Sequence, residues 1–358
     1  GEFSGLGIDA LKPLRQWPAT LGGDLVLGGD WRVDAGETLS GQLGLARERG
    51  DLVLADTALG LKRLRLAATA ENNQLRASLE AEGGRLGNLR ANGTSRLSRR
   101  DGVWGLGGDA PLRAEADLAL KSLAWAAPLL DKRGISALDG QLDAHLTADG
   151  SLAAPRLSGT LGGERFSLAL PEHGLRFNDG RFLAELRQDR LELKRLSLRG
   201  GDGGLTAQGS LALREARPDL RLALRADKLT VISRPDRLLV LSGDGNLALA
   251  ADKLRLDARL KADRGQFELA AEDAPSLSED VVVLGREAPA RARGLPWDVV
   301  MDLDLDLGER FFLRARGLDA QLGGSLKLAG RKGLAPRANG SIRVLKGAYA
   351  AYGQRLED

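Results

Sequence analysis

The chain has 358 residues, of which 43% are hydrophobic but only 4% aromatic, so Leu, Ala and Val supply nearly all of its apolar surface. Its 52 basic and 49 acidic residues nearly cancel and alternate closely, which excludes the one-sided basic surface typical of nucleic-acid-binding proteins. The absence of cysteine excludes disulfides and thiolate chemistry. Glycine, with 47 residues, is about twice as frequent as usual, which favours many short elements joined by sharp turns.

Two segments break the general pattern and are predicted to form short helices, near residues 8–17 and 122–130. Each carries a tryptophan on its apolar side, Trp17 and Trp125, and we expect both to cap the apolar face of a sheet. An interfacial membrane contact is the alternative. No stretch reaches the roughly 18 apolar residues of a membrane-spanning helix, and no signal peptide opens the chain. Gly1-Glu2-Phe3 resembles a cloning remnant, so we expect a piece cut from a longer protein.

Most of the chain alternates apolar and polar residues, the pattern of half-exposed β-strands. The clearest example is Met301-Asp302-Leu303-Asp304-Leu305-Asp306-Leu307, which puts all apolar side chains on one face. The same alternation recurs at residues 191–193, 220–225, 246–249 and 253–260, with glycine-rich turns between. A long meander of strands is predicted.

Weak internal repetition supports this prediction. Residues 140–161 align with residues 320–342, and the spacing from Pro155 to Gly159 equals that from Pro336 to Gly340. A looser copy begins at Gly209, so the repeating unit is predicted to be a hairpin. Hairpins that bury their apolar face only by stacking form elongated structures.

No catalytic or metal-binding motif stands out. Asp302, Asp304 and Asp306 follow one another at about 6.6 Å along a strand, too far apart for one ion, and are predicted to be a solvated face. His145 and His173 stand alone in the sequence, without the neighbouring residues from which a zinc site or a catalytic triad would be built. We therefore expect no enzyme activity, no cofactor and no metal.

Glycine-rich strings also resemble known motifs. Residues 5–10 match a dinucleotide-binding string but follow no strand, and residues 200–204 resemble one calcium-binding repeat without the neighbouring copies it needs. Both are better explained as turns.

The apolar face itself is the candidate functional feature. An open groove of aliphatic side chains would suit an acyl chain, which needs no hydrogen bonds; a closed core is the alternative, because periodicity does not separate the two. The candidate groove residues, taken from strict alternation, are Leu247, Leu249, Leu254, Leu256, Met301, Leu303, Leu305, Leu307, Leu326, Leu328, Ile342 and Val344.

The closing part of the chain resembles a known family. The segments 317–320, 324–326, 339–344 and 347–356 are similar to the TamB (translocation and assembly module) family, and the likeness extends to 278–283 and 234–237, and loosely to 140–180. The resemblance implies an all-β fold: an elongated, curved antiparallel or mixed sheet that forms a taco-like trough with an apolar lumen and short helical plugs. On this basis residues 131–358 are the TamB-like region, continuous with a less distinctive β-rich repeat region, 1–130.

The resemblance also implies a function and a place. It suggests the central to C-terminal periplasmic region of a Gram-negative protein, similar to AsmA-like lipid bridges, anchored in the inner membrane by an N-terminal helix absent here. The expected function is a non-enzymatic conduit for phospholipid acyl chains between the two membranes. The alternative is a scaffold that assembles unfolded outer-membrane protein strands and autotransporters with TamA, through a region expected to lie partly beyond Asp358. A β-helical enzyme or adhesin ranks below both.

Overall fold

The computed structural model describes residues 1–10, 21–54, 56–126, 137–171, 174–214, 217–269, 298–315, 317–331, 337–351 and 354–357. The chain divides into two compact units, one formed by residues 1–170 and 176–198 and the other by 171–175 and 199–358. The predicted division near residue 130 remains a prediction, and each unit is described below by itself.

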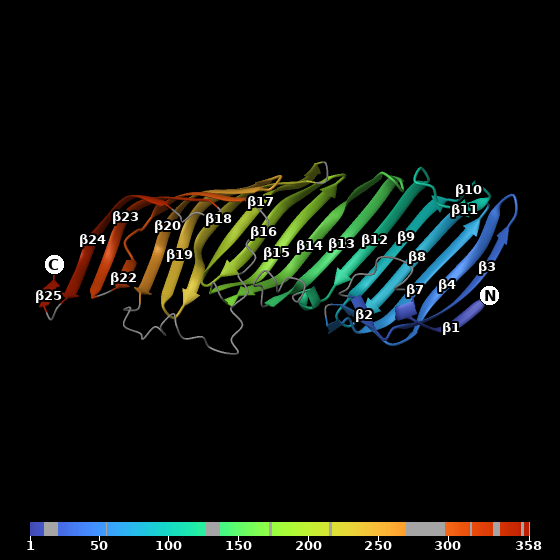
Figure 1. Cartoon of the computed structure of the whole chain (residues 1–358), viewed down its shortest axis with the longest axis horizontal. Coiled ribbons are helices and arrows are strands. Elements are labelled where there is room, and N and C mark those ends of the chain that lie inside the picture. The colour runs from blue at the N-terminus through green and yellow to red at the C-terminus, as the bar shows by residue number, and fades with distance from the viewer. Residues whose placement is uncertain are drawn as a thin grey trace, which may run out of the picture. The chain divides into compact units, whose positions relative to one another are not determined.

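The first unit is a sheet of antiparallel strands. Its pairing order is β1-β3-β4-β7-β8-β9-β12-β13-β14, continuing through β15 and β16 (Figure 1). A three-stranded sheet of β2, β5 and β6 and the hairpin β10-β11 are separate from it. The elements are β1 (Glu2–Gly7), β2 (Leu21–Gly23), β3 (Val26–Ala35), β4 (Leu39–Arg49), β5 (Leu52–Leu54), β6 (Thr57–Ala58), β7 (Leu61–Glu71), β8 (Gln74–Gly83), β9 (Gly87–Arg96), β10 (Ser98–Arg100), β11 (Val103–Gly105), β12 (Pro111–Leu120), η2 (Ala124–Ala126), β13 (Ala137–Ser151), β14 (Pro155–Leu170), β15 (Leu175–Arg187) and β16 (Arg190–Gly200).

The second unit is a mixed sheet. Strands β17 to β20 form an antiparallel meander, after which β21 and β22 run one after the other parallel to β20. Both also pair antiparallel with β23, which β24 and β25 follow. The elements are β17 (Gly203–Arg214), β18 (Arg217–Arg234), β19 (Arg237–Ala250), β20 (Lys253–Leu269), β21 (Asp298–Asp306), β22 (Phe311–Ala315), β23 (Leu318–Arg331), β24 (Arg337–Ala351) and β25 (Gln354–Glu357).

The predicted all-β fold is confirmed, with a curved sheet that mixes antiparallel and parallel pairs. Local sequence explains the turns as well: Asn72 and Asn73 join β7 to β8 with φ of 48° and 67°, the left-handed conformation that a two-residue hairpin turn requires.

The two predicted helices are not seen in the described residues. Residues 8–10 form one 3-10 turn and Ala124–Ala126 another, while residues 11–17 and 127–130 lie outside the described part. The turn at 124–126 is held by Asp139, whose carboxylate accepts hydrogen bonds from the Ser122 hydroxyl and the Leu123 N–H.

Neither unit has a large closed core in its described residues. The first contains a small buried cluster of Ile8, Leu25, Leu27, Leu61 and Ala81. The second contains one of Leu307, Ala320 and Leu322. Fully buried large side chains are limited to Leu25 among the described residues. The apolar face of each sheet therefore extends well beyond the region that is buried.

Candidate functional site

The strand register of the second unit brings the twelve candidate groove residues onto one face. Directly paired residues share a face, so apolar side chains form rows that run across the strands. Among the pairs that contain candidates are Leu249 with Leu254, Leu247 with Leu256, Leu256 with Met301, Leu303 with Leu328, Leu305 with Leu326, Ile342 with Gly324 and Val344 with Leu322. Leu307 lies on the same face, two residues beyond Leu305, within the buried cluster.

Most of these side chains are only half-buried. Leu249 and Leu307 are buried, with exposed fractions of 5% and 2%, whereas Ile342 and Val344 are exposed at 53% and 58%. The other eight are half-buried. A leucine in a filled core would be buried almost completely. In the described residues, therefore, the face is open rather than covered by a second layer.

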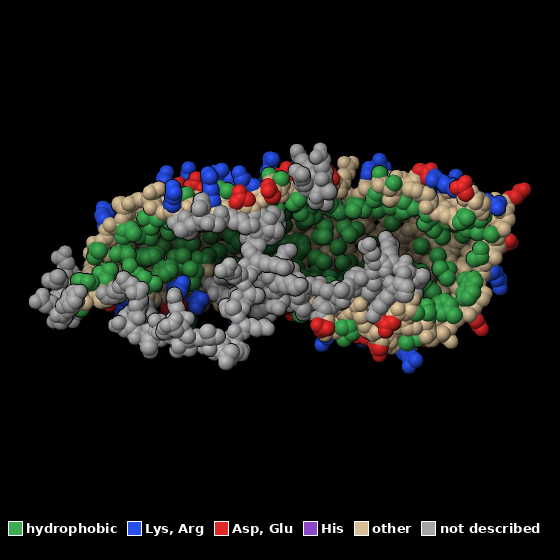
Figure 2. Space-filling view, in the orientation of Figure 1, with side chains coloured by type: hydrophobic (Ala, Val, Ile, Leu, Met, Phe, Trp, Pro, Cys, Tyr) green, Lys and Arg blue, Asp and Glu red, His purple; other side chains and the backbone are tan. Residues whose placement is uncertain are grey.

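The first unit carries a matching face that the sequence reasoning missed. One of its rows, running from β4 to β13, consists of Leu45, Leu66, Leu79, Ala91, Ala116 and Leu146. Apolar and polar residues alternate in 64–68, 75–81 and 112–118, and this pattern predicts the row. Frequent alanine makes the pattern weaker than it is in the leucine-rich strands of the second unit. Figure 2 shows hydrophobic side chains gathered in a hollow in each unit.

The opposite face is polar and carries charges of alternating sign across the strands. One row of the second unit consists of Arg225, Asp244, Arg259, Asp304 and Lys327. Within it, Arg225 Nη1 lies 3.9 Å from Asp244 Oδ1 and Lys327 Nζ lies 3.8 Å from Asp304 Oδ1. The predicted solvated face of Asp302, Asp304 and Asp306 belongs to this side. Opposite charges on neighbouring strands favour this register over a slip by one residue.

Glycines with unusual backbone angles interrupt the apolar rows at regular places. Gly159, Gly209, Gly243 and Gly340 have φ between 148° and 157°, and each is paired with a leucine of the neighbouring strand. At each, an added Cβ would collide with a backbone carbonyl oxygen of the paired strand. Only glycine allows this conformation and this close approach, which bends the strand. The repeat seen in the sequence thus marks a repeated bend, and such bends curve a sheet.

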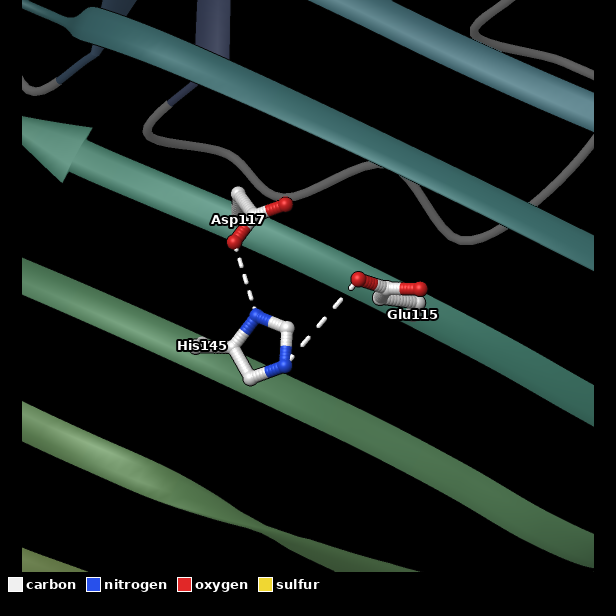
Figure 3. A group of neighbouring side chains, drawn as sticks. All are labelled: Glu115, Asp117 and His145. Carbon is white, nitrogen blue, oxygen red and sulfur yellow. Dashed lines mark hydrogen bonds and ion pairs between the residues drawn. The ribbon is translucent and has the colours of Figure 1, made fainter.

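On the polar face of the first unit, Glu115 and Asp117 of β12 lie beside His145 of β13 (Figure 3). His145 Nδ1 lies 2.8 Å from Asp117 Oδ1, and His145 Nε2 lies 4.0 Å from Glu115 Oε1. The hydrogen bond to Asp117 raises the pKa of His145 above its ordinary 6.5. Sequence reasoning treated this histidine as isolated, because its neighbours come from a strand 28 residues earlier.

The fold and its two faces define the class of protein. In the described residues it is a curved β-sheet with one open apolar face, one charged face and no large closed core, which is the arrangement of a β-taco. Residues 194–357 match the TamB C-terminal domain, which supports membership of this part of the chain in the TamB family. The match associates it with the bacterial envelope and with the translocation and assembly module of outer-membrane assembly. No curated protein matches the chain, and no solved structure matches it. None of the helices described is long and apolar enough to cross a membrane.

Proposed function

We propose that this chain is a non-enzymatic, periplasmic segment of a bridge protein that conducts phospholipid acyl chains between the inner and outer membranes along its apolar face. The observation that carries the proposal is the half-exposed state of the apolar rows. Ten of the twelve groove residues, eight of them half-buried and two exposed, keep part of their surface available to a ligand.

The chemistry of the face suits a sliding lipid. In the paired row of β18 to β23 that contains Leu222, Leu247, Leu256, Met301 and Gly330, every inward side chain is aliphatic or a glycine. Towards β22 the same face also carries the stacked rings of Phe267 and Phe311. Each methylene group of an acyl chain that moves from water onto such a surface stabilises binding by about 0.8 kcal/mol, wherever along the surface it lies. Selective pockets instead place a few polar groups to fix their ligand. A uniform surface holds acyl chains without fixing their position.

Photocrosslinking in cells tests this proposal. A diazirine amino acid is placed at Leu303 or Leu326, both half-buried on the apolar face, and at Asp304 as the control on the polar face. Phospholipid adducts at the two leucine positions, and none at Asp304, are expected. Adducts confined to other residues of the same chain would mean that the face is packed shut and would overturn the proposal.

The second candidate is a scaffold for unfolded outer-membrane protein strands, acting with TamA. The unpaired part of β24 favours it: β25 pairs only with Ala348–Ala351, so residues 337–347 have no further partner strand among the described residues. An open strand edge is a template for adding another strand. The same experiment separates the two, because protein adducts from outer-membrane strands would replace lipid adducts.

A further inference from the structure

The cluster of Glu115, Asp117 and His145 lies on the polar face and takes no part in the proposed lipid path. Glu115 and Asp117 are two residues apart on β12, so their side chains project from the same face of the strand. His145 is paired directly with Asp117 across the β12–β13 ladder. All three are exposed, so a dissolved ion reaches them freely.

The hydrogen bond between His145 and Asp117 decides which imidazole nitrogen is free. An ionised carboxylate only accepts hydrogen bonds, so Nδ1 must donate its proton to Asp117 Oδ1, 2.8 Å away. In the neutral imidazole this leaves the lone pair on Nε2, the atom that faces Glu115. Metal-binding histidines commonly donate their other N–H to a carboxylate in this way, which orients the ring and makes it a stronger ligand.

The gap between His145 Nε2 and Glu115 Oε1 has the size of a metal site. Zinc binds nitrogen at about 2.0–2.1 Å and carboxylate oxygen at about 2.0–2.2 Å, so two ligands in tetrahedral positions lie about 3.4 Å apart. The observed distance is 4.0 Å. The Glu115 side chain is 59% exposed, so it can rotate to close the difference. An imidazole with a carboxylate suits zinc better than Mg²⁺ or Ca²⁺, which prefer oxygen ligands alone.

We propose that His145 and Glu115 bind a zinc ion on the polar face of the first unit, with Asp117 as the residue that positions His145. Water or a donor from another molecule completes the coordination. On the side of Asp117 away from His145, its partner in the strand register is Arg90 of β9. The ion would tie its ligands on β12 and β13 together.

Zinc titration of the full chain by calorimetry, at about pH 8, tests the proposal. We expect binding that is lost in His145→Ala and weakened by about 10- to 100-fold in Asp117→Asn, as is usual when the carboxylate behind a metal-bound histidine is removed. The matched controls are Asp143→Asn, an exposed carboxylate on the same strand, and His173→Ala, the second of the two histidines. Both should bind zinc like the unaltered chain.

A thermal melt with and without zinc provides a second readout, with circular dichroism to confirm that each variant is folded. Zinc should raise the melting temperature of the unaltered chain and of Asp143→Asn but not of His145→Ala. At about pH 5 protonation of His145 should abolish the effect. The groups whose charge bears on that protonation are Asp117 and Glu115 on β12. Undiminished zinc binding by His145→Ala, loss of binding in His173→Ala, or no binding by the unaltered chain would overturn the proposal.

Discussion

At the scale of single residues, the glycines of the apolar rows shape the sheet. The bend glycines of the apolar rows occupy a backbone region that other residues rarely adopt, and their Cα atoms lie close against the neighbouring strand. Gly93, in the same apolar face of the first unit, is different, because an added Cβ there would meet Ala114 Cβ at an ordinary 3.6 Å. Glycines of the two kinds should therefore respond differently to substitution.

Gly159→Ala should lower the free energy of unfolding by about 1–3 kcal/mol, the range for forcing an ordinary residue into a sparsely populated conformation. Its φ is 151° and the new methyl group would collide with the His145 carbonyl oxygen. Gly93→Ala, the control, should be neutral or slightly stabilising, because alanine loses less chain entropy on folding. Urea denaturation measures both. Equal stability of the two variants would show that the bend does not require glycine.

At the scale of elements, strand register depends on both faces at once. A slip by one residue would turn every leucine outward and every charge inward, so the alternating pattern opposes it. The charges add a finer distinction, because in the row through Asp304 they alternate in sign from strand to strand. Asp304 lies between Arg259 and Lys327, whereas Asp302 lies beside Asp257, which forms an ion pair with Arg255 of its own strand.

Asp304→Lys should therefore destabilise the sheet by about 0.2–1 kcal/mol for each like-charged neighbour it creates, Arg259 and Lys327. Asp302→Lys, two residues away on the same strand, should change stability less, because its neighbours Arg255 and Asp257 carry opposite charges and already form an ion pair with each other. Urea denaturation at low salt compares them, and added salt should reduce both effects. The prediction fails if Asp302→Lys destabilises the sheet as much as Asp304→Lys does.

At the scale of the whole molecule, the apolar face, which is open in the described residues, connects the fold with the proposed lipid path. A buried aspartate is costly in a packed core, but on a face that solvent partly reaches it can remain hydrated. The same charge would nevertheless stand in the path of an acyl chain. Substitution on this face therefore separates the folding role of a leucine from its role in binding.

Leu328→Asp should reduce the lipid that copurifies with the folded chain by at least about tenfold, because the contact of one leucine is worth about 1.5–3 kcal/mol. Leu328 is half-buried and paired with Leu303, outside the small buried cluster. Ala329→Asp places the same charge on the polar face of the same strand and should leave bound lipid unchanged. Native mass spectrometry measures the lipid. If Leu328→Asp unfolds the chain, the face is a closed core.

The sequence by itself determined which residues share a face. Alternation with a period of two is a local property of the extended chain, so Met301 to Leu307 predicted an apolar side and a charged side without knowledge of any partner strand. The family likeness added the curved trough. Short helices near Trp17 and Trp125 were predicted on the same local grounds, but single 3-10 turns are all that the described residues contain there.

Only the tertiary structure decided which strands meet and what covers them. Alternation carries no information on pairing partners, so the parallel placement of β21 beside β20 and the meeting of His145 with Asp117 could not be inferred. The open state of the face was undetermined for the same reason, since a leucine in a filled core and one in an open trough follow the same period. Strand pairing, and the covering of a sheet face by other residues, bring together residues that are far apart in the chain. Both depend on the folded arrangement of all the strands together.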